Sequence, residues 1–562
     1  MVLRFEGVSY RYGSVEDWAL ADLNLVVRPG ESILVAGASG SGKSTLCRAS
    51  IGLIPHFHGG ELIGCVRVDG WDTREHPVHE LFGHVGLAFQ NPDAQLFNQT
   101  VEAELAYGLE SVGLAPEEIE RRLTWVSEVA RLRPLLDRSP HSLSGGEKQC
   151  VVLGAILALR PRLVLLDEPF THLDPEGAER LRAILRAMRA EGIGFIVVEH
   201  RLHAIVDEVD RLVVLHRGHV VADGPPRQVL AQDLSNYGLN LPPLVLFFRE
   251  QGRVETPLTV DEALLCLRKS VETQEGRDPS SYRSLGWSFP DHSLKPANPL
   301  SGFRNSVIEV NRVQFSYGDL AVLSGVNLKL NRGECVALAG RNGGGKTTLV
   351  KHFNGLLKPD SGEVKVLGRD TRTTSVSELA RHVGFAWQNP NDQLFQANVR
   401  DEVLTGPRVL RAYDPAWCDR LFERFGLVPL MDRSPFRLSE GEKKRVAFAT
   451  ALAVQPEVVI LDEPTAGQDE PFRRELGSLI RELRAEGRTV VLVTHDLEFA
   501  AENADRWVTL AGGQIVADGP PQEVMGDSEA MAAAGLRPTQ LFQLRKALAE
   551  WSSEEGTKPY VV

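Results

Sequence analysis

The sequence has few cysteines and few long apolar runs. Its 562 residues include six scattered cysteines without a C-x-x-C pair; this fits neither a disulfide framework nor a zinc site and favours a reducing cytosol. The longest apolar stretches, such as 151–159, reach about half of the ~20 residues that a membrane span needs. The first ten residues contain no apolar signal-peptide core. We therefore expect a chain that does not itself cross a membrane.

An excess of positive charge is missing as well. Lys and Arg number 62 against 75 Asp and Glu, a formal net charge of −13, so no basic face is indicated and we expect no nucleic-acid partner. Hydrophobic residues at 43% and charged residues at 24% are ordinary globular values, which disfavours disordered and fibrous classes. The length alone suggests roughly three or four domains.

What the sequence does contain is a long internal repeat. The copies are 37–45 and 340–348, 89–97 and 387–395, 143–147 and 438–442, and 165–169 and 460–464. The offset is 303 residues between Lys43 and Lys346 and 295 residues between Ser144 and Ser439. The chain is therefore a tandem duplication whose first half carries about eight extra residues before Ser144, as insertions in surface loops would produce.

Each half reads as an α/β domain. Short stretches rich in apolar residues predict strands at 23–27, 33–36, 163–166, 194–198, 326–330, 335–339, 458–461 and 489–493. Helical patterns lie between these runs, and strands that alternate with helices predict a mainly parallel sheet.

A helical appendage follows each half. Thr259 and Glu262 form a capping box ahead of an amphipathic pattern, and 238–243 resembles 535–539. A stretch rich in Ser, Pro, Gly and Asn then reads as a linker. The expected division is a first domain at 1–225, an appendage at 226–271, a linker at 272–305, a second domain at 306–520 and a C-terminal appendage at 521–562.

The glycine-rich copies carry the clearest chemistry. Gly37-x4-Gly42-Lys43-Ser44 follows a predicted strand and opens a predicted helix, and 340–347 repeats it. In a phosphate-binding loop, glycines let backbone N–H groups face the phosphates, the lysine reaches the β- and γ-phosphates, and the hydroxyl binds Mg²⁺. Two copies, each after a strand, make a chance glycine-rich turn negligible.

Paired carboxylates end a buried strand in each half. Asp167 and Glu168 follow four apolar residues, and Asp462 and Glu463 repeat them. The first of each pair suits Mg²⁺, and the second suits the polarisation of an attacking water. The alternative is a pair that simply faces solvent, which the upstream phosphate loops disfavour.

The copies 143–147 (Leu-Ser-Gly-Gly-Glu) and 438–442 (Leu-Ser-Glu-Gly-Glu) resemble the signature motif of ABC ATPases. The resemblance covers nearly all of both halves and implies two tandem P-loop NTPase domains, each with a helical signature subdomain. It assigns Glu168, His200, Glu463 and His495 to catalysis and Asp174 and Asp469 to the D-loops. The implied Mg²⁺ ligands are Ser44, Gln90, Asp167, Thr347, Gln388 and Asp462. The implied ATP contacts are Tyr12, Gly37, Ala38, Ser39, Gly40, Ser41, Gly42, Lys43, Ser44, Thr45, Gln90, Ser144, Gly145, Gly146, Tyr317, Gly340, Arg341, Asn342, Gly343, Gly344, Gly345, Lys346, Thr347, Thr348, Gln388, Ser439 and Gly441.

The resemblance also implies a head-to-tail pair of halves. Each ATP would lie between the phosphate loop of one half and the signature motif of the other, so that Ser144 faces the nucleotide of Lys346 and Ser439 that of Lys43. Loss of the γ-phosphate would then open the pair. Because both halves keep the lysine, the glutamate and the histidine, we expect both sites to be active.

The sequence departs from the family pattern in the signature motifs. Glutamate replaces the usual final glutamine at Glu147 and Glu442, and Glu440 stands where glycine is commoner. A carboxylate at 440 either repels a γ-phosphate or points away from it. We predict that the two ATP sites differ modestly, which the ATPase rate of a Glu440→Gly variant tests.

The motif Gln-Asn-Pro-x-x-Gln-Leu-Phe at 90–97 and 388–395 resembles the ATPases of energy-coupling factor transporters for cobalt and vitamins. This implies a peripheral protein on the cytoplasmic face of the membrane, with a transmembrane coupling subunit and a substrate-binding membrane subunit as partners. Asp93 and Asp392 are candidate contacts for arginines of the coupling subunit. The resemblance suggests a vitamin, a vitamin precursor or a metal ion as cargo, with thiamine or its hydroxymethylpyrimidine precursor first.

Three other interpretations stay open. A tandem ABC protein that acts on ribosomes usually has a basic linker, whereas 251–306 holds seven basic and seven acidic residues. A fused sugar-importer ATPase often has one weakened site, and a binding-only regulator would not need two intact Glu/His pairs.

His56 and His58 form an incomplete metal pattern in an extra loop. The charged residues that follow Asp174, from Glu176 to Arg182, are interpreted as a solvated helix face.

Overall fold

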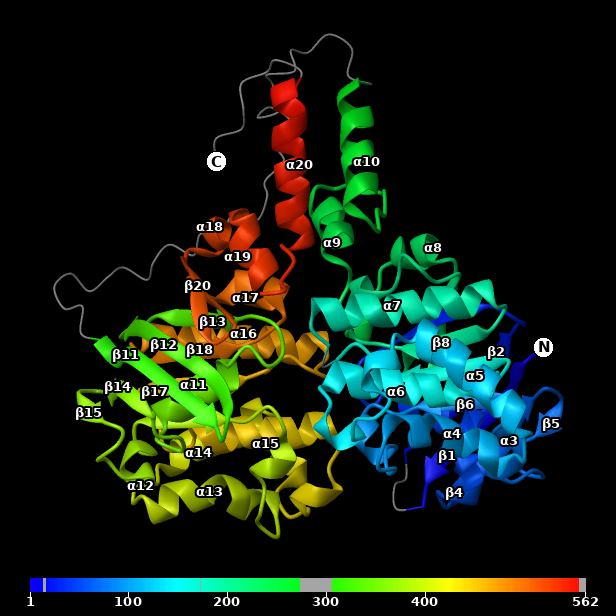
Figure 1. Cartoon of the computed structure of the whole chain (residues 1–562), viewed down its shortest axis with the longest axis horizontal. Helices are drawn as coiled ribbons and strands as arrows, with labels where there is room; N and C mark the ends of the chain where they lie inside the picture. Colours follow the sequence, from blue (N-terminus) through cyan, green and yellow to red (C-terminus); the bar gives the residue numbers. More distant parts are fainter. Residues whose placement is uncertain (14–16, 172, 273–305, 555–562) are drawn as a thin grey trace. The chain divides into compact units, whose positions relative to one another are not determined.

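The computed structural model describes residues 1–13, 17–171, 173–272 and 306–554. The predicted linker at 272–305 therefore lies outside the described residues except for its first position. The chain divides into two compact units, Met1–Trp287 with Gln543–Val562, and Ser288–Phe542. Each unit has its own pair of sheets and its own helices (Figure 1).

The first unit contains a six-stranded sheet in the order β10-β9-β3-β8-β7-β6. Its strands are β3 (Ser32–Ala36), β6 (Val85–Ala88), β7 (Leu163–Asp167), β8 (Gly194–Val198), β9 (Arg211–His216) and β10 (His219–Gly224). All neighbours pair in parallel except β10, which runs antiparallel to β9. The predicted mainly parallel sheet is confirmed.

A separate antiparallel sheet in this unit has the order β2-β1-β4-β5. Its strands are β1 (Leu3–Tyr12), β2 (Leu20–Val27), β4 (Gly60–Val68) and β5 (Trp71–Asp72). The strand predicted at 23–27 exists, but its place in the mainly parallel sheet was wrong. It forms a hairpin with β1, since only the short connection 13–19 separates the two strands.

Helices cover the sheets of the first unit. They are α1 (Lys43–Ser50), α2 (Leu53–His56), α3 (Val78–Leu81), α4 (Val101–Ser111), α5 (Pro116–Val129), α6 (Gly145–Ala158), α7 (Pro175–Ala190), α8 (Pro226–Leu230), α9 (Pro243–Glu250) and α10 (Val260–Glu272). Helices α4, α5 and α6 contact one another and form a helical subdomain. Thr259 Oγ1 accepts a hydrogen bond from the backbone N–H of Glu262 at 3.3 Å, which confirms the predicted start of α10.

The second unit repeats this plan, with sheets in the orders β16-β17-β18-β13-β19-β20 and β12-β11-β14-β15. The first holds β13 (Cys335–Ala339), β16 (Val383–Ala386), β17 (Val458–Asp462), β18 (Thr489–Val493), β19 (Arg506–Ala511) and β20 (Gln514–Gly519). The second holds β11 (Ser306–Tyr317), β12 (Leu320–Asn331), β14 (Ser361–Val366) and β15 (Arg369–Asp370). As in the first unit, the predicted strand at 326–330 belongs to the antiparallel sheet.

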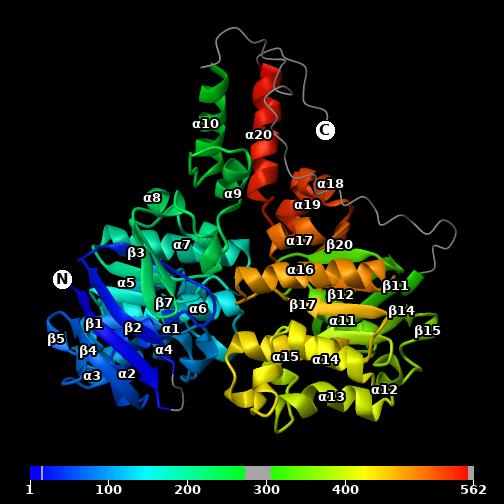
Figure 2. The same cartoon turned by 180° about the vertical axis from the view of Figure 1, so that it is seen from behind.

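The helices of this half follow the same order. They are α11 (Lys346–Phe353), α12 (Val376–Leu379), α13 (Val399–Val409), α14 (Pro415–Arg424), α15 (Glu440–Leu452), α16 (Glu470–Ala485), α17 (Leu497–Asn503), α18 (Pro521–Gly526), α19 (Ser528–Ala533) and α20 (Gln540–Glu554), the last of which passes into the first unit. Figure 2 shows α13, α14 and α15 side by side, and α15 contacts both of the others.

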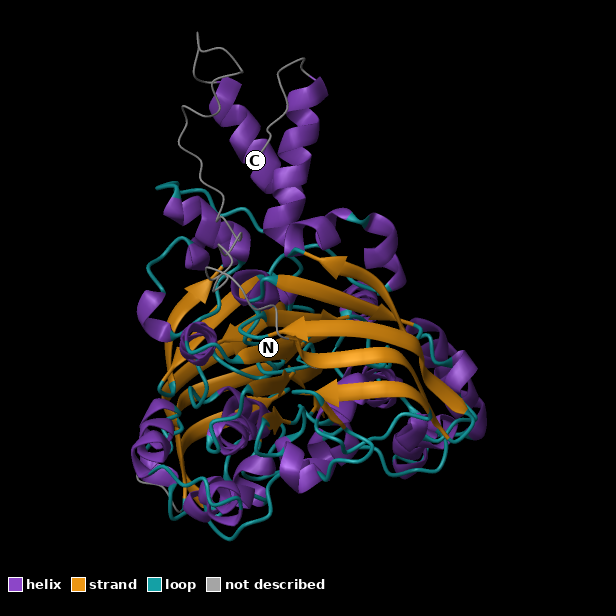
Figure 3. Ribbon diagram, turned by 90° about the vertical axis from the view of Figure 1, so that its left-hand side faces the viewer, coloured by secondary structure: helices purple, strands orange, loops and turns teal. Residues whose placement is uncertain are grey.

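Each six-stranded sheet separates two hydrophobic cores. Along β7, Val164 and Leu166 face the core under the helical subdomain, whereas Leu163 and Leu165 face the core shared with α1 and the antiparallel sheet. Strand β17 alternates in the same way. Figure 3 shows strands in orange and helices in purple. Burial on both faces explains why the parallel strands read as continuous apolar runs.

Candidate functional site

A glycine-rich loop joins β3 to α1, and its copy joins β13 to α11. A Cβ atom at Gly37 would lie 2.4 Å from the carbonyl oxygen of Leu215, and one at Gly340 would lie 2.4 Å from that of Leu510. The first position of each loop therefore accepts only glycine. Gly42, which caps α1, has a φ of 104°, a conformation that a residue with a side chain rarely adopts.

The lysine of each loop is the first residue of the helix that follows. Lys43 Nζ donates to two carbonyl oxygens of its own loop at 2.8 and 2.9 Å, and Lys346 Nζ does so at 2.7 and 3.0 Å. Both ammonium groups thus lie in the concave side of a loop at a helix N-terminus, where a phosphate group is favoured.

A hydroxyl and an aspartate meet beside each loop. Thr347 Oγ1 donates to Asp462 Oδ2 at 2.9 Å, and Ser44 hydrogen-bonds to Asp167. Among the described residues, the Oδ1 atoms of both aspartates are buried without a hydrogen-bond partner. Burial raises the pKa of Asp167 to about 6 and that of Asp462 to about 7. Because a carboxylate oxygen and a hydroxyl are oxygen ligands that Mg²⁺ prefers, both places fit the predicted ion.

The predicted catalytic glutamates lie directly after these aspartates. Glu168 and Glu463 have φ values of 50° and 48°, a conformation that costs a non-glycine residue of order 1–3 kcal/mol and is concentrated at functional sites. His200 Nε2 lies 3.1 Å from Glu168 Oε1, and His495 Nδ1 lies 2.8 Å from Glu463 Oε1. Although burial opposes it, the nearby histidine lowers the pKa of Glu463 to about 2, and the pKa of Glu168 is lowered in the same way.

The two predicted Q-loop glutamines, Gln90 and Gln388, have different surroundings. Gln90 Nε2 donates to Glu168 Oε2 at 2.8 Å, so the structure brings this glutamine to the Glu168–His200 pair. Gln388 is exposed, and the equivalent oxygen of Glu463 instead accepts a bond from Thr494 Oγ1 at 3.4 Å.

A family model described as "ABC transporter" matches residues 20–171 and 323–466. A Methanosarcina mazei protein, whose name describes it as an ABC transporter ATP-binding protein, is 36% identical over 547 residues, which are 96% of this chain and 92% of that protein. The chain belongs to the ABC transporter ATP-binding proteins. Each matched region holds one glycine-rich loop and one carboxylate pair, and the histidine of each half follows the matched region, at His200 or His495.

Other ABC proteins match over similar lengths. A Caldanaerobacter subterraneus protein with the same description is 35% identical and covers 97% of this chain and 95% of its own length. A Streptomyces avermitilis protein is 37% identical, with 94% and 96% coverage. The solved structure of CbiO1 from Clostridium perfringens, described as part of the ABC transporter complex CbiONQ, is 31% identical, covers 43% of this chain and 99% of that chain, and gives a TM-score of 0.35.

The signature motifs of this ABC protein begin α6 and α15. Ser144 Oγ donates to Glu147 Oε2 at 2.7 Å and accepts from the Glu147 N–H at 3.4 Å. Ser439 and Glu442 form the same box, at 2.8 and 3.3 Å. The glutamate that replaces the family's glutamine is therefore half of a capping box. Gly145, Gly146 and Gly441 lie in the first turn of these helices.

The D-loop aspartates also cap helices. Asp174 Oδ1 accepts from the Gly177 N–H at 2.8 Å at the start of α7, and Asp469 Oδ1 accepts from the Phe472 N–H at 3.2 Å at the start of α16. Each D-loop thereby fixes the direction in which its helix leaves the strand end that holds the carboxylates.

The predicted adenine-stacking tyrosines differ between the halves. The Tyr12 hydroxyl is 3.2 Å from Thr45 Oγ1 and accepts a bond from Arg48 at 3.0 Å. Tyr317 is exposed and packs edge-on against Phe315, with ring centroids 4.9 Å apart. Within the part of the chain that the structure describes, Tyr12 is the one of the two that hydrogen-bonds to the helix after its phosphate loop.

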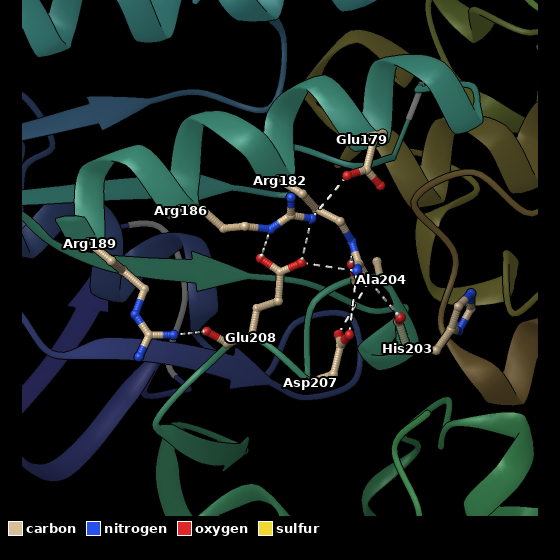
Figure 4. A network of polar contacts seen from close by, with 8 residues as sticks. All are labelled: Glu179, Arg182, Arg186, Arg189, His203, Ala204, Asp207 and Glu208. Carbon is tan, nitrogen blue, oxygen red and sulfur yellow. Dashed lines mark hydrogen bonds and ion pairs between the residues drawn. The ribbon is translucent and has the colours of Figure 1, made fainter. Parts of the chain in front are cut away.

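The prediction of a solvated face from Glu176 to Arg182 was wrong for Arg182, whose side chain is only 21% exposed. Arg182 Nε donates to the Ala204 carbonyl at 2.8 Å, and Arg182 and Arg186 both reach Glu208, at 3.1 and 3.0 Å. Figure 4 shows these side chains converging on the segment after His200, with Glu179 at the margin. The arginines of α7 therefore join this helix to the segment that follows His200. Alternating Arg and Glu in a sequence cannot show whether a helix faces solvent or a neighbouring loop, so this contact was not predicted.

The Gln-Asn-Pro motif builds a rigid loop in each half. Asn91 Oδ1 caps the short helix η1 (Pro92–Ala94), and Gln95 accepts from the Phe89 N–H at 2.7 Å and donates to the Leu87 carbonyl at 2.9 Å. The buried carboxylate of Glu104 accepts from the backbone N–H groups of 97 and 98 at 3.1 and 2.8 Å.

The copy of this loop in the second half is held by Glu402, which accepts from the N–H groups of 395 and 396 at 2.8 and 2.7 Å. The loop contains η7 (Pro390–Asp392). The last residue of each motif, Phe97 or Phe395, keeps 60% or 66% of its surface exposed. The motif therefore presents an aromatic ring from a fixed backbone.

Some site residues were missed because they are not part of a recognised motif. Glu199 is fully buried next to His200, and its carboxylate accepts from the N–H groups of Phe170 and His200 at 2.8 and 3.1 Å. Thr494 occupies the equivalent position in the second half. Lys444 is buried below Glu463, donates to the Ala466 carbonyl at 3.2 Å, and has its pKa lowered to about 8 by burial. For Glu199 the available signal was a carboxylate directly after an apolar run, whereas Lys444 stands among charged residues at 442–445 and offers no such signal.

Replacing Glu199 with glutamine is expected to stabilise the first unit at pH 8 and to have little effect at pH 5. Burial raises the pKa of Glu199 from 4.5 to about 7 although the charge of Arg201 opposes it. The folded state therefore binds this proton more tightly than the unfolded chain does, and stability falls as pH rises from about 4.5 to about 7. The difference is at most about 3 kcal/mol, or about 6 °C in the thermal midpoint at pH 8.

Calorimetry of both proteins from pH 5 to pH 8 measures this effect. The exposed Glu191→Gln substitution is the matched control and should give the same small difference at every pH. A Glu199→Gln effect that does not change with pH would contradict the assignment.

His56 and His58 lie in the described part of the chain. His56 Nε2 is 2.8 Å from the Thr73 carbonyl oxygen, and the His58 ring lies 6.2 Å from that of Tyr12. No cluster of three or more histidine, cysteine or carboxylate side chains suited to a metal occurs among the described residues. In that same part of the chain, none of the helices combines the length and the apolar character that crossing a bilayer requires.

Proposed function

We propose that this ABC protein is the ATP-hydrolysing subunit of a membrane importer of the energy-coupling factor type. One observation carries the proposal: both halves combine a loop–carboxylate–histidine site with a braced Gln-Asn-Pro loop that exposes a phenylalanine. The first feature suits ATP turnover, and the second suits docking on a partner.

ATP would be held by the two glycine-rich loops. In the first, backbone N–H groups of Gly37 to Gly42 and the ammonium of Lys43 would take the phosphates, with Ser44 and Thr45 at the start of α1; residues 340–348 would do the same in the second. Asp167 with Ser44 and Asp462 with Thr347 would hold Mg²⁺, joined by Gln90 and Gln388. The ion would supply charge neutralisation at the phosphate oxygens.

Glu168 and Glu463 would act on the attacking water. Each carboxylate is ionised at neutral pH because its pKa is lowered, so it can accept a hydrogen bond and a proton from water. His200 and His495 would hold these carboxylates in position and contact the γ-phosphate. Tyr12 and Tyr317 would stack on adenine.

The sites would be composite. We propose that the two halves pair head to tail, so that Ser144 and the start of α6 complete the site of Lys346 and Ser439 and the start of α15 complete that of Lys43. The capped N-terminus of a helix favours a phosphate through its unpaired N–H groups. Asp174 and Asp469 would lie at the same junction.

The remaining parts follow from this assignment. The domain division 1–225, 226–271, 272–305, 306–520 and 521–562 would place both ATPase domains on the cytoplasmic face of the membrane as a peripheral pair. A coupling subunit would bind the Gln-Asn-Pro loops, and a separate membrane subunit would select a vitamin, a vitamin precursor or a metal ion. Thiamine and hydroxymethylpyrimidine are the first cargoes to test, by measuring their uptake into vesicles that contain the reconstituted complex.

Replacing Phe97 and Phe395 together with alanine is expected to reduce copurification of hydrophobic membrane proteins from detergent extracts by about tenfold or more. Exposed aromatic anchors commonly contribute about 2 kcal/mol or more to an interface. Quantitative mass spectrometry of tagged chain purified from membranes measures the ratio.

Phe57→Ala is the matched control, because Phe57 is 73% exposed and lies outside both loops. It should retain the membrane proteins. Recovery of ribosomes in place of membrane proteins with the unmodified chain would overturn the proposed function.

A further inference from the structure

An ion pair joins the Gln-Asn-Pro loop to the signature helix in the first half. Lys148 Nζ in the first turn of α6 lies 2.6 Å from Asp93 Oδ1 in η1. The lysine side chain is only 15% exposed. Asp93, a candidate contact for a coupling subunit, thus already has a partner within its own half.

The second half builds the same connection from different residues. Lys443 Nζ donates to Glu440 Oε1 at 2.8 Å and to Asn391 Oδ1 at 2.9 Å, and Asn391 Nδ2 reaches Glu440 Oε2 at 3.3 Å. The Glu440 carboxylate is therefore directed at its own loop and lysine. This places it in the signature helix as a polar partner of the loop.

The halves have exchanged the position of one carboxylate. The lysines, and likewise positions 145 and 440, are separated by 295 residues, and 93 and 391 by 298, which are the offsets of their motifs. In the first half the loop carries the acid and the helix carries Gly145; in the second the helix carries the acid and the loop carries Asn391. Each connection therefore keeps one ammonium and one carboxylate.

We propose that these two clusters, Asp93–Lys148 and Asn391–Glu440–Lys443, are equivalent latches through which a partner on the Gln-Asn-Pro loop positions the signature helix. The inference rests on the proposed function of that loop. The lysine belongs to the same helical turn as the capping serine, so a displacement of the braced loop is passed to the helix N-terminus. Lys148 and Lys443 act as positioning residues.

The exchange supplies its own test. Asp93→Asn removes the acid of the first latch, and adding Gly145→Glu rebuilds it in the form of the second. Conversely, Glu440→Gly breaks the second latch, and adding Asn391→Asp rebuilds it in the form of the first. A Cβ atom at Gly145 would have no heavy atom within 4 Å, so the helix has room for the side chain.

The first measurement uses the purified full chain without any partner. Acylation of individual lysines by a mild amine reagent, followed by mass spectrometry, should be about fivefold faster at Lys148 in Asp93→Asn and at Lys443 in Glu440→Gly. Both double variants should return to the unmodified rate. Asp392→Asn, which removes an acid without an ion pair among the described residues, should change neither rate.

The second measurement uses the complex with its membrane partner. Each single variant should lower the ratio of partner-stimulated to basal ATP turnover about threefold with little change in KM for ATP, and adding Asn391→Asp to Glu440→Gly should restore it. Double variants that fail to restore acylation, or single variants that leave the ratio unchanged, would overturn the latch. If no membrane protein binds even the unmodified chain, the proposed function fails and the acylation result alone decides whether the latches exist.

Discussion

Replacing Glu168 and Glu463 together with glutamine is expected to reduce ATP turnover by at least about a hundredfold. Both carboxylates lie at the ends of buried strands, within 3.1 and 2.8 Å of a histidine, in a strained backbone conformation. Glutamine keeps the size and the hydrogen-bonding oxygen but cannot accept a proton from water. Phosphate release from the purified full chain measures the loss.

Binding should survive this change. Because the phosphate loops are untouched, the double variant should still bind ATP and should accumulate the ATP-bound form. Glu176→Gln, an exposed position in the first turn of α7, is the matched control and should retain turnover. Turnover within threefold of the unmodified rate in the double variant would remove both glutamates from the mechanism.

Replacing Arg473 with methionine is expected to destabilise the second unit by about 3–5 kcal/mol. Arg473 forms an ion pair with Asp496, and their side chains are only 8% and 6% exposed. Methionine leaves the carboxylate buried without its counter-charge, although Thr465 Oγ1 still donates to it at 2.8 Å. At roughly 2 °C per kcal/mol for a unit of this size, the thermal midpoint should fall by about 6–10 °C.

The neighbouring residue provides the control. Arg474 is 74% exposed and pairs with Glu470 at 2.9 Å; an exposed pair of this kind contributes about 0.5 kcal/mol or less. Calorimetry of Arg474→Met should therefore show a shift of about 1 °C. Equal shifts for the two variants would mean that burial does not set the strength of the Arg473 pair.

The parts of the site that follow from local chain chemistry were predictable. The phosphate loops, the paired carboxylates and the capped signature helices each lie within one short segment, where spacing alone places glycine, lysine, acid and hydroxyl. The strands at 163–166 and 458–461 were predicted because burial on both faces leaves a continuous apolar run.

The parts that depend on long-range packing were not predictable. A strand at 23–27 looks the same in either sheet, and only its pairing with β1 reveals the antiparallel one. Arg182 was interpreted as solvent-facing because its carboxylate partner, Glu208, lies 26 residues farther along the chain. The positive φ of Glu168 could not be predicted from the residue type, because glutamate rarely adopts this conformation.

The residues around the shared motifs differ between the two halves. Glu199 and Arg201 of the first half stand where Thr494 and Asp496 stand in the second, and Gln149 stands where Lys444 does. These substitutions lie near Glu168 and Glu463, the proposed catalytic residues, so we expect the two sites to differ in pH dependence as well as in rate. The Glu440→Gly variant tests a separate difference, that between Gly145 and Glu440.

Disulfide cross-linking tests the head-to-tail arrangement most directly. The six native cysteines are free, and five are buried. Replacing the sixth, Cys266, with serine in the Glu168→Gln, Glu463→Gln chain therefore minimises cross-links through native cysteines. Ser39→Cys with Ser439→Cys joins the two halves, whereas Ser39→Cys with Ser144→Cys stays within one.

The predicted result is a cross-link in the first pair that forms on addition of ATP to monomeric chain and is seen as a mobility shift. The second pair should remain unlinked with or without ATP. A cross-link in the Ser39–Ser144 pair together with none in the Ser39–Ser439 pair, in the presence of bound ATP, would contradict the composite sites on which the account depends.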